Sequence, residues 1–143
     1  MSFFAYKKGE MHAEGVPLKT IAAQVGTPFY CYSAAALRAA LLEFTRGMKG
    51  MNASVCYAMK ANSSLAVIKL FAEMGAGADI VSEGEMRRAL AAGVPANRII
   101  YSGVGKKATE LMAALQAGVG QINDSGVRIL HSARALRKVA VGK

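Results

Sequence analysis

Long hydrophobic runs are missing from this sequence, although 53% of its 143 residues are hydrophobic. No stretch approaches the roughly 18 consecutive apolar residues that a membrane-spanning helix needs. The start of the chain, Met1 to Lys8, lacks the long apolar core of a secretion signal. We therefore expect no membrane partner and predict a cytoplasmic location.

Residues that bind metals or form disulfides are also scarce. The two cysteines, Cys31 and Cys56, lack metal-ligand spacing and lie in apolar, strand-like runs, which predicts reduced core residues. His12 and His131 have no cysteine or carboxylate partner at ligand spacing, so no metal site is predicted.

Acidic residues are few: nine Asp and Glu stand against eighteen Lys and Arg, a formal net charge of +9. Residues 124–143 carry five basic side chains against Asp124, a net +4, and residues 1–123 carry thirteen bases and eight acids, a net +5. The bases near the end of the chain have no aromatic residues between them, as a single-strand nucleic-acid binder would need. Nucleic-acid binding is therefore not predicted.

The sequence does contain a repeat of strand-like and helix-like segments. Strand ends fall near Lys60, Ser82, Gly103 and Asn123, each about one strand plus one helix apart. This alternation predicts a parallel sheet with right-handed crossovers, as in a βα-barrel or a doubly wound sheet. No Gly-x-Gly-x-x-Gly follows the first strand to support dinucleotide binding. Predicted strands cover residues 3–6, 27–32, 53–59, 78–81, 98–102 and 119–123, and predicted helices cover residues 17–25, 34–46, 65–74, 83–92 and 108–116.

Lys60 follows the apolar run of residues 53–59 directly. A lysine at the carboxyl end of a buried strand lies where α/β folds place their chemistry. Desolvation there favours a neutral amine, which can attack an aldehyde and form a Schiff base. The spacing alone leaves open that Lys60 is one more solvated cation.

The motif Tyr57-Ala58-Met59-Lys60-Ala61-Asn62 resembles the lysine motif of the pyridoxal-phosphate decarboxylases of the alanine racemase and ornithine decarboxylase fold. The stretches at residues 6–10, 13–18 and 26–30 resemble the amino-terminal segment of diaminopimelate decarboxylases in particular. The resemblance extends over about residues 2–123. It implies pyridoxal 5'-phosphate as cofactor, a small amino-acid substrate, a homodimer for the full-length family, and decarboxylation of meso-2,6-diaminopimelate to L-lysine.

The resemblance implies a partial (β/α)8 TIM-type barrel, an α/β fold of which about the first half is present. It divides the chain into an amino-terminal segment, 1–32, which in the family pairs with a β-domain, a partial barrel, 33–123, and an atypical basic tail, 124–143. Family members continue differently after Asn123, so we interpret the tail as out-of-frame or otherwise non-homologous sequence. The chain is then expected to be a truncated, inactive form. Alternatives are a non-catalytic interaction module or another enzyme of this fold, such as an ornithine- or arginine-type decarboxylase or alanine racemase.

Two site residues follow from the resemblance. Lys60 is expected to bind the cofactor covalently and to be catalytic. Asp79, in Gly75-Ala76-Gly77-Ala78-Asp79, matches a family aspartate beside the cofactor, where a carboxylate would keep Lys60 charged between turnovers. The alternative for Asp79 is a strand-end carboxylate that caps a loop.

Other motif residues have structural explanations. Ser82 and Glu85 form a predicted capping box, which accounts for Glu85 although it matches a family glutamate. Asn62 is expected to fix the turn after Lys60 by bonding backbone. The Gly103-Val104-Gly105-Lys106 loop lacks the spacing of a phosphate-binding loop, which makes Lys106 peripheral.

Overall fold

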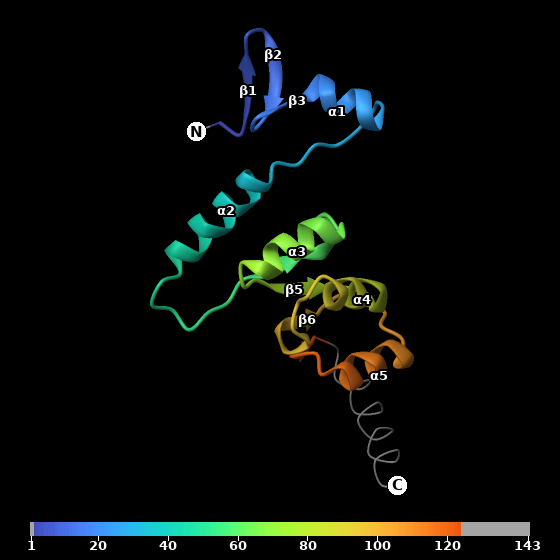
Figure 1. The fold of residues 1–143 in the computed structure, drawn as a ribbon. Helices are drawn as coiled ribbons and strands as arrows, with labels where there is room; N and C mark the ends of the chain where they lie inside the picture. The colour runs from blue at the N-terminus through green and yellow to red at the C-terminus, as the bar shows by residue number, and fades with distance from the viewer. Residues whose placement is uncertain (1, 124–143) are drawn as a thin grey trace, which may run out of the picture. The chain divides into compact units, whose positions relative to one another are not determined.

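The computed structural model of the protein describes residues 2–123, and the chain divides into two compact units. The first unit is Met1–Met51, and the second begins at Asn52 (Figure 1). The predicted atypical tail, 124–143, lies outside the described residues. Within the described part, none of the helices combines the length and hydropathy needed to cross a membrane.

The first unit contains a small antiparallel sheet and two helices. The sheet has the order β1-β2-β3, with β1 paired to β2 and β2 paired to β3. Pro17 immediately precedes the first helix, and Gly26, with φ of 80°, ends it, as the sequence predicts. The elements are β1 (Phe4–Lys7), β2 (Glu10–Ala13), β3 (Val16–Pro17), α1 (Leu18–Val25) and α2 (Ala34–Gly47).

Helix α2 begins at a hydrogen-bonded cap. The Ser33 hydroxyl accepts a hydrogen bond from the Ala36 amide at 2.9 Å, which confirms the predicted N-cap. The Glu14 carboxylate, just after β2, accepts from the Ser33 hydroxyl at 2.7 Å and from the Ala35 amide at 3.0 Å. These bonds tie the end of β2 to the start of α2 within the first unit.

The prediction of a strand at residues 27–32 is wrong. This segment has no strand assignment, and the only sheet described in the first unit consists of β1, β2 and β3. Its aromatic and β-branched residues suit a pleated surface, but a strand also needs a neighbouring ladder of hydrogen bonds. No described strand pairs with this segment.

The second unit is a four-stranded parallel sheet with the order β4-β5-β6-β7. The alternation of strand and helix predicted from the sequence is confirmed, although β4 is shorter than the predicted 53–59 run. The elements are β4 (Cys56–Ala58), the 3-10 turn η1 (Met59–Ala61), α3 (Leu65–Glu73), β5 (Gly77–Ile80), α4 (Glu83–Ala91), the 3-10 turn η2 (Ala96–Arg98), β6 (Ile99–Tyr101), α5 (Ala108–Ala117) and β7 (Gln121–Ile122).

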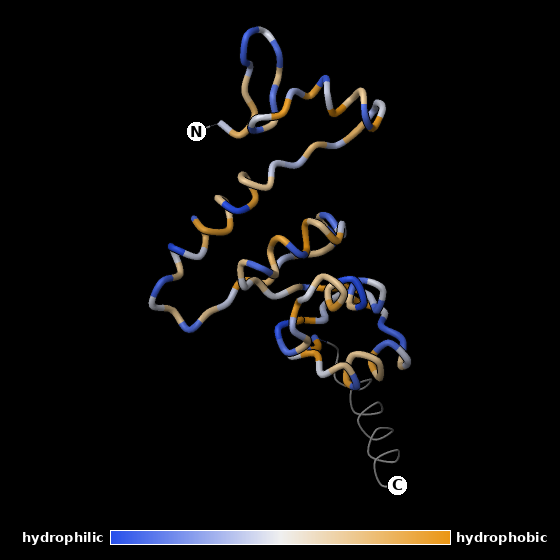
Figure 2. The backbone as a smooth tube through the Cα atoms, viewed as in Figure 1, coloured by the Kyte–Doolittle hydropathy of each residue, from blue (hydrophilic) through white to orange (hydrophobic). Residues whose placement is uncertain are grey.

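The core of the second unit lies between the sheet and its helices. Ala78, Ile80, Ile99 and Tyr101 are fully buried on the strands and pack with apolar residues of α3, α4 and α5. Figure 2 shows hydrophobic segments recurring along the helices, as amphipathic helices require. Because side chains alternate along a strand, Asp79 and Ile100 face away from these helices. The other face of the sheet is therefore the one that carries Asp79.

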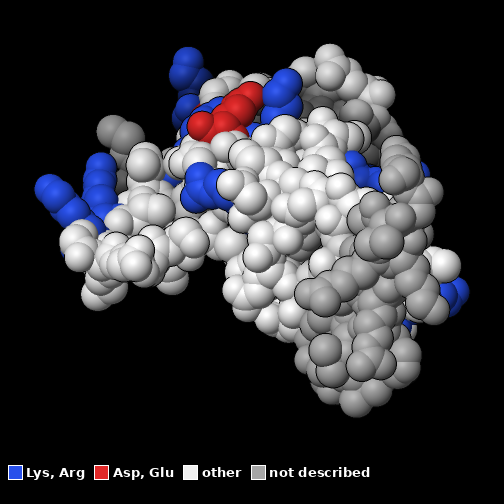
Figure 3. Space-filling view, turned by 90° about the horizontal axis from the view of Figure 1, so that it is seen from below, with Lys and Arg blue, Asp and Glu red and all other residues white. Residues whose placement is uncertain are grey.

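Basic residues are distributed in separate groups on the face shown in Figure 3. Lys and Arg side chains are drawn blue there, and uncharged surface lies between several of them.

Candidate functional site

Lys60 lies at the carboxyl edge of the parallel sheet. It is the middle residue of the η1 turn, which follows β4 directly, and its side chain is exposed. The preceding Met59 is fully buried and anchors the turn in the core. Ala58, the last residue of β4, pairs with Asp79 on β5. Lys60 and Asp79 therefore belong to neighbouring strand ends at the same edge.

Asp79 has a carboxylate oxygen that is buried and lacks a partner. Among the described residues, its Oδ1 atom makes no hydrogen bond. Leaving a buried acceptor unsatisfied costs about 1–3 kcal/mol. The alternative interpretation of Asp79 as a carboxylate that caps a loop would need a hydrogen bond from the loop, and this oxygen accepts none from the described residues. A cationic or N–H-bearing group beside Oδ1 would remove the cost.

The turn that follows Lys60 is held by hydrogen bonds to Asn62. The Asn62 Oδ1 atom accepts from the Ser64 amide at 2.9 Å, and the Tyr57 hydroxyl donates to the Asn62 carbonyl at 3.0 Å. The Tyr57 ring packs on Phe71 of α3 with centroids 4.5 Å apart. The prediction that Asn62 bonds backbone in this turn is confirmed. This set of contacts fixes the chain on both sides of Lys60.

The predicted capping box at α4 is half correct. The Ser82 hydroxyl accepts from the Glu85 amide at 3.2 Å, as predicted. The Glu85 carboxylate does not return to Ser82; it accepts from the Val81 amide at 2.7 Å. Glu85 thus holds the short link between β5 and α4, close to the strand end that carries Asp79.

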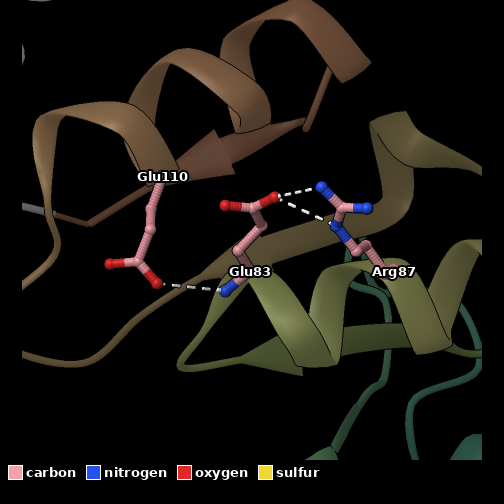
Figure 4. Close-up of polar contacts among 3 residues, drawn as sticks. All are labelled: Glu83, Arg87 and Glu110. Atoms are coloured by element: carbon pink, nitrogen blue, oxygen red, sulfur yellow. Dashed lines mark hydrogen bonds and ion pairs between the residues drawn. The ribbon is translucent and has the colours of Figure 1, made fainter.

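Glu110 joins the starts of α4 and α5. Its carboxylate accepts from the Lys107 amide at 2.9 Å and, more weakly, from the Glu83 amide at 3.4 Å. The Glu83 carboxylate in turn binds the Arg87 guanidinium, with a closest approach of 2.6 Å (Figure 4). Burial, and then the charge of Glu110, raise the pKa of Tyr101 to about 12, so this phenol stays neutral. One carboxylate therefore holds two of the loops at the carboxyl edge.

Acid is expected to weaken this junction. The Lys107 amide is the main cause that lowers the pKa of Glu110 below its ordinary value of 4.5. The stability that Glu110 contributes is therefore complete above that value and is lost as the pH falls through the lowered pKa. The melting temperature of Glu110→Gln should lie below that of the unmodified chain at pH 7, and the difference should shrink toward pH 3. Glu43→Gln, at an exposed position on α2, is the control; an equal acid response in both variants would contradict the prediction.

Lys106, which the sequence analysis treats as peripheral, is a buried residue at the carboxyl edge of the sheet. It is only 3% exposed, and its Nζ atom donates to the Gly103 carbonyl at 2.7 Å and to the Asn123 carbonyl at 2.5 Å. Gly103 and Gly105 have φ of 83° and 75°, which folds the loop back toward the strand ends. The two glycines were the available sequence signal, but they do not show where the lysine points.

A chain of polar side chains at the carboxyl ends of β6 and β7 was also missed. Gln121 donates to the Asn123 Oδ1 atom at 2.7 Å, and the Asn123 amide group donates to the Ser102 hydroxyl at 3.3 Å. Asp79 pairs with Ile100, and Ile100 pairs with Gln121. By strand alternation, Ser102, Gln121 and Asn123 therefore share the sheet face of Asp79.

These features define an α/β protein whose candidate site lies at the carboxyl ends of parallel strands, with a lysine after the first of them. The chain belongs to the family described as "Pyridoxal-dependent decarboxylase, pyridoxal binding domain", which matches residues 20–140. The family cofactor is pyridoxal phosphate, in agreement with the prediction.

Known diaminopimelate decarboxylases are similar to this chain. The Pseudomonas fluorescens enzyme is 48% identical over 123 residues, which cover 86% of this chain and 30% of that protein. A crystal structure of a protein from Aquifex aeolicus has a TM-score of 0.88 at 38% identity, covering 94% of this chain and 34% of that one. The diaminopimelate decarboxylase of Helicobacter pylori, complexed with L-lysine, has a TM-score of 0.79 at 37% identity, covering 83% of this chain and 31% of that one. The chain thus spans about a third of the length of these relatives. The predicted fold class, a partial barrel of the pyridoxal-phosphate decarboxylases, is confirmed.

Proposed function

We propose that this chain is the amino-terminal, lysine-bearing part of a diaminopimelate decarboxylase, which converts meso-2,6-diaminopimelate to L-lysine. Lys60 would hold pyridoxal phosphate covalently, and Asp79 would lie beside it. One observation carries the proposal: Lys60 follows the strand whose last residue pairs with Asp79, which has a buried carboxylate oxygen without a hydrogen-bond partner in the part of the chain that the structure describes. A homodimer, a cytoplasmic location and the division into 1–32, 33–123 and 124–143 belong to the proposal through the family resemblance.

The described residues fit this cofactor. The Lys60 side chain is exposed, so an aldehyde can reach its amine. The Oδ1 atom of Asp79 is an acceptor that no residue among 2–123 uses. When bound, pyridoxal phosphate supplies a ring that delocalises the electron pair left by loss of carbon dioxide.

The roles of the two residues follow from their chemistry. The Lys60 amine would attach the cofactor, release it to the substrate amine, and move a proton to or from the reacting carbon. The Asp79 carboxylate would stabilise the ammonium form of Lys60 and orient the side chain between turnovers. The Asn62 and Tyr57 hydrogen bonds would limit the movement of the turn that carries Lys60.

Covalent labelling tests the proposal. The chain is incubated with pyridoxal phosphate and reduced with borohydride, and modified lysines are mapped by mass spectrometry. We expect Lys60 to be labelled faster than Lys69, an exposed lysine on α3 that serves as internal control. In Lys60→Arg, which keeps the charge but not the nucleophilic amine, the selective label should disappear. Equal labelling of Lys60 and Lys69 would refute the proposal.

A further inference from the structure

Lys106 is an ammonium group inside the protein that the proposed mechanism does not use. Removing such a cation from water costs several kcal/mol unless nearby groups compensate it. Two backbone carbonyls accept hydrogen bonds from its Nζ atom, that of Gly103 at 2.7 Å and that of Asn123 at 2.5 Å. The Nζ atom also lies 5.3 Å from the centroid of the Tyr101 ring, within the range of a cation–π interaction. The two carbonyls and the aromatic ring therefore compensate the ammonium group for its lost hydration.

The two carbonyls belong to neighbouring strand ends. Gly103 follows β6, and Asn123 follows β7 directly. The ladder continues to this edge, because the Ser102 amide donates to the Ile80 carbonyl at 2.8 Å and the Asn123 amide donates to the Tyr101 carbonyl at 2.9 Å. Lys106 thus links the carboxyl ends of β6 and β7 beyond their last ladder bonds, at the edge that also holds Lys60.

What Lys106 fixes is a set of side chains on the face of Asp79. The Asn123 backbone that it binds carries the side chain that contacts Ser102 and Gln121. If the Asn123 carbonyl lost its partner, the strand end could shift and this polar chain would lose its orientation. Both of these hydrogen bonds go to backbone carbonyls at strand ends, so an effect of Lys106 on the site would pass through those strand ends.

We propose that Lys106 is a positioning residue of the pyridoxal-phosphate site: it clamps the ends of β6 and β7 so that Ser102 and Asn123 present their side chains beside Asp79. This inference rests on the proposed function of Lys60. It assigns the polar side chains Ser102, Gln121 and Asn123 to the wall of the cofactor site. It also gives the Gly103–Lys106 loop a role in positioning strand ends, in place of phosphate binding.

Two measurements on the whole chain test the clamp, with Lys107→Met as matched control. Lys107 is the next residue, is exposed, and loses the same charge on substitution. In Lys106→Met, exchange of the Ser102 and Asn123 amide hydrogens without cofactor should be about fivefold faster than in the control, since the strand ends open locally. Labelling of Lys60 by pyridoxal phosphate should be about fivefold slower, because a misplaced wall aligns the cofactor less well. Lys106→Arg, which retains the charge and the donors, should recover most of both effects.

The possible outcomes separate the two proposals. If Lys106→Met and Lys107→Met give equal amide exchange or equal Lys60 labelling, the clamp is refuted while the function of Lys60 stands. If the unmodified chain labels Lys60 no faster than Lys69, the proposed function fails and the clamp fails with it. If Lys106→Met loses its helical circular dichroism, Lys106→Gln replaces it, and the same two comparisons decide.

Discussion

Replacement of Asp79 by alanine is expected to stabilise the chain while impairing attachment of the cofactor. The buried Oδ1 atom has no hydrogen-bond partner among the described residues, and removing it should raise the free energy of unfolding by about 1 kcal/mol. The same change removes a carboxylate from the strand end next to the one that Lys60 follows. Under the proposed function, labelling by pyridoxal phosphate should then slow roughly ten- to hundredfold, the range for loss of a charged hydrogen bond. Denaturant unfolding and the labelling assay measure the two effects.

The opposite signs make this prediction specific. Removing a residue with a purely structural role lowers the free energy of unfolding. Removing a site residue whose buried polar atom has no partner raises it, because that atom destabilises the folded chain. Asp79→Asn keeps the shape and loses the charge, so it should impair labelling without the gain in stability. Glu43→Ala, at an exposed acidic position on α2, controls for the change in net charge. Unchanged labelling in Asp79→Ala would remove Asp79 from the site.

Replacement of Gly77 by alanine is expected to destabilise the second unit by about 3 kcal/mol, at the upper end of the cost of overpacking a core. A Cβ atom at Gly77 would lie 2.3 Å from the Arg98 carbonyl oxygen and 2.7 Å from the Cys56 Sγ atom. The cysteine side chain has some freedom to move, but the carbonyl belongs to the backbone that leads into β6. The strands on either side of β5 would have to separate, which breaks the parallel ladder near the Asp79 register.

A second glycine in the same unit provides the control. Gly84 lies in α4, where an added Cβ meets only the Ser82 hydroxyl at 3.8 Å. Because alanine is the better helix former, Gly84→Ala should stabilise the chain by roughly 0.5–1 kcal/mol. Urea unfolding, followed by circular dichroism, compares both variants with the unmodified chain. If Gly77→Ala unfolds at the same urea concentration as the unmodified chain, the predicted close packing around β5 is wrong.

The glycines of the Gly75-Ala76-Gly77-Ala78-Asp79 motif therefore have separate physical explanations. Gly75 has φ of 84°, a conformation that suits glycine, in the turn between α3 and β5. Gly77 is needed for the close approach of neighbouring backbone. The motif leads the chain from α3 into β5 and places Asp79 two residues after Gly77. Its two glycines are therefore needed for the turn and for close packing, whatever the chemical role of Asp79.

Local signals in the sequence determined much of this protein. The alternation of strands and helices, the caps at Ser33 and Ser82, and the turn at Asn62 each depend on residues close together in the chain. The position of Lys60 immediately after a strand follows from the same kind of signal. The resemblance to the pyridoxal-phosphate decarboxylases is also local, because the consecutive residues 57–62 carry its lysine motif.

The tertiary structure decided the features that need a distant partner. Residues 27–32 have the composition of a strand, but a strand exists only where another strand supplies its ladder. Lys106 has the sequence context of a surface cation, yet it is buried, and one of its acceptors is the carbonyl of Asn123, which lies 17 positions further along the chain. Asp79 is a candidate site residue whose removal is expected to change the free energy of unfolding. The reason is that its Oδ1 atom is buried without a hydrogen bond among the described residues. Short-range preferences act within a few residues, whereas pairing, burial and satisfaction of polar groups depend on what the folded chain brings next to each group.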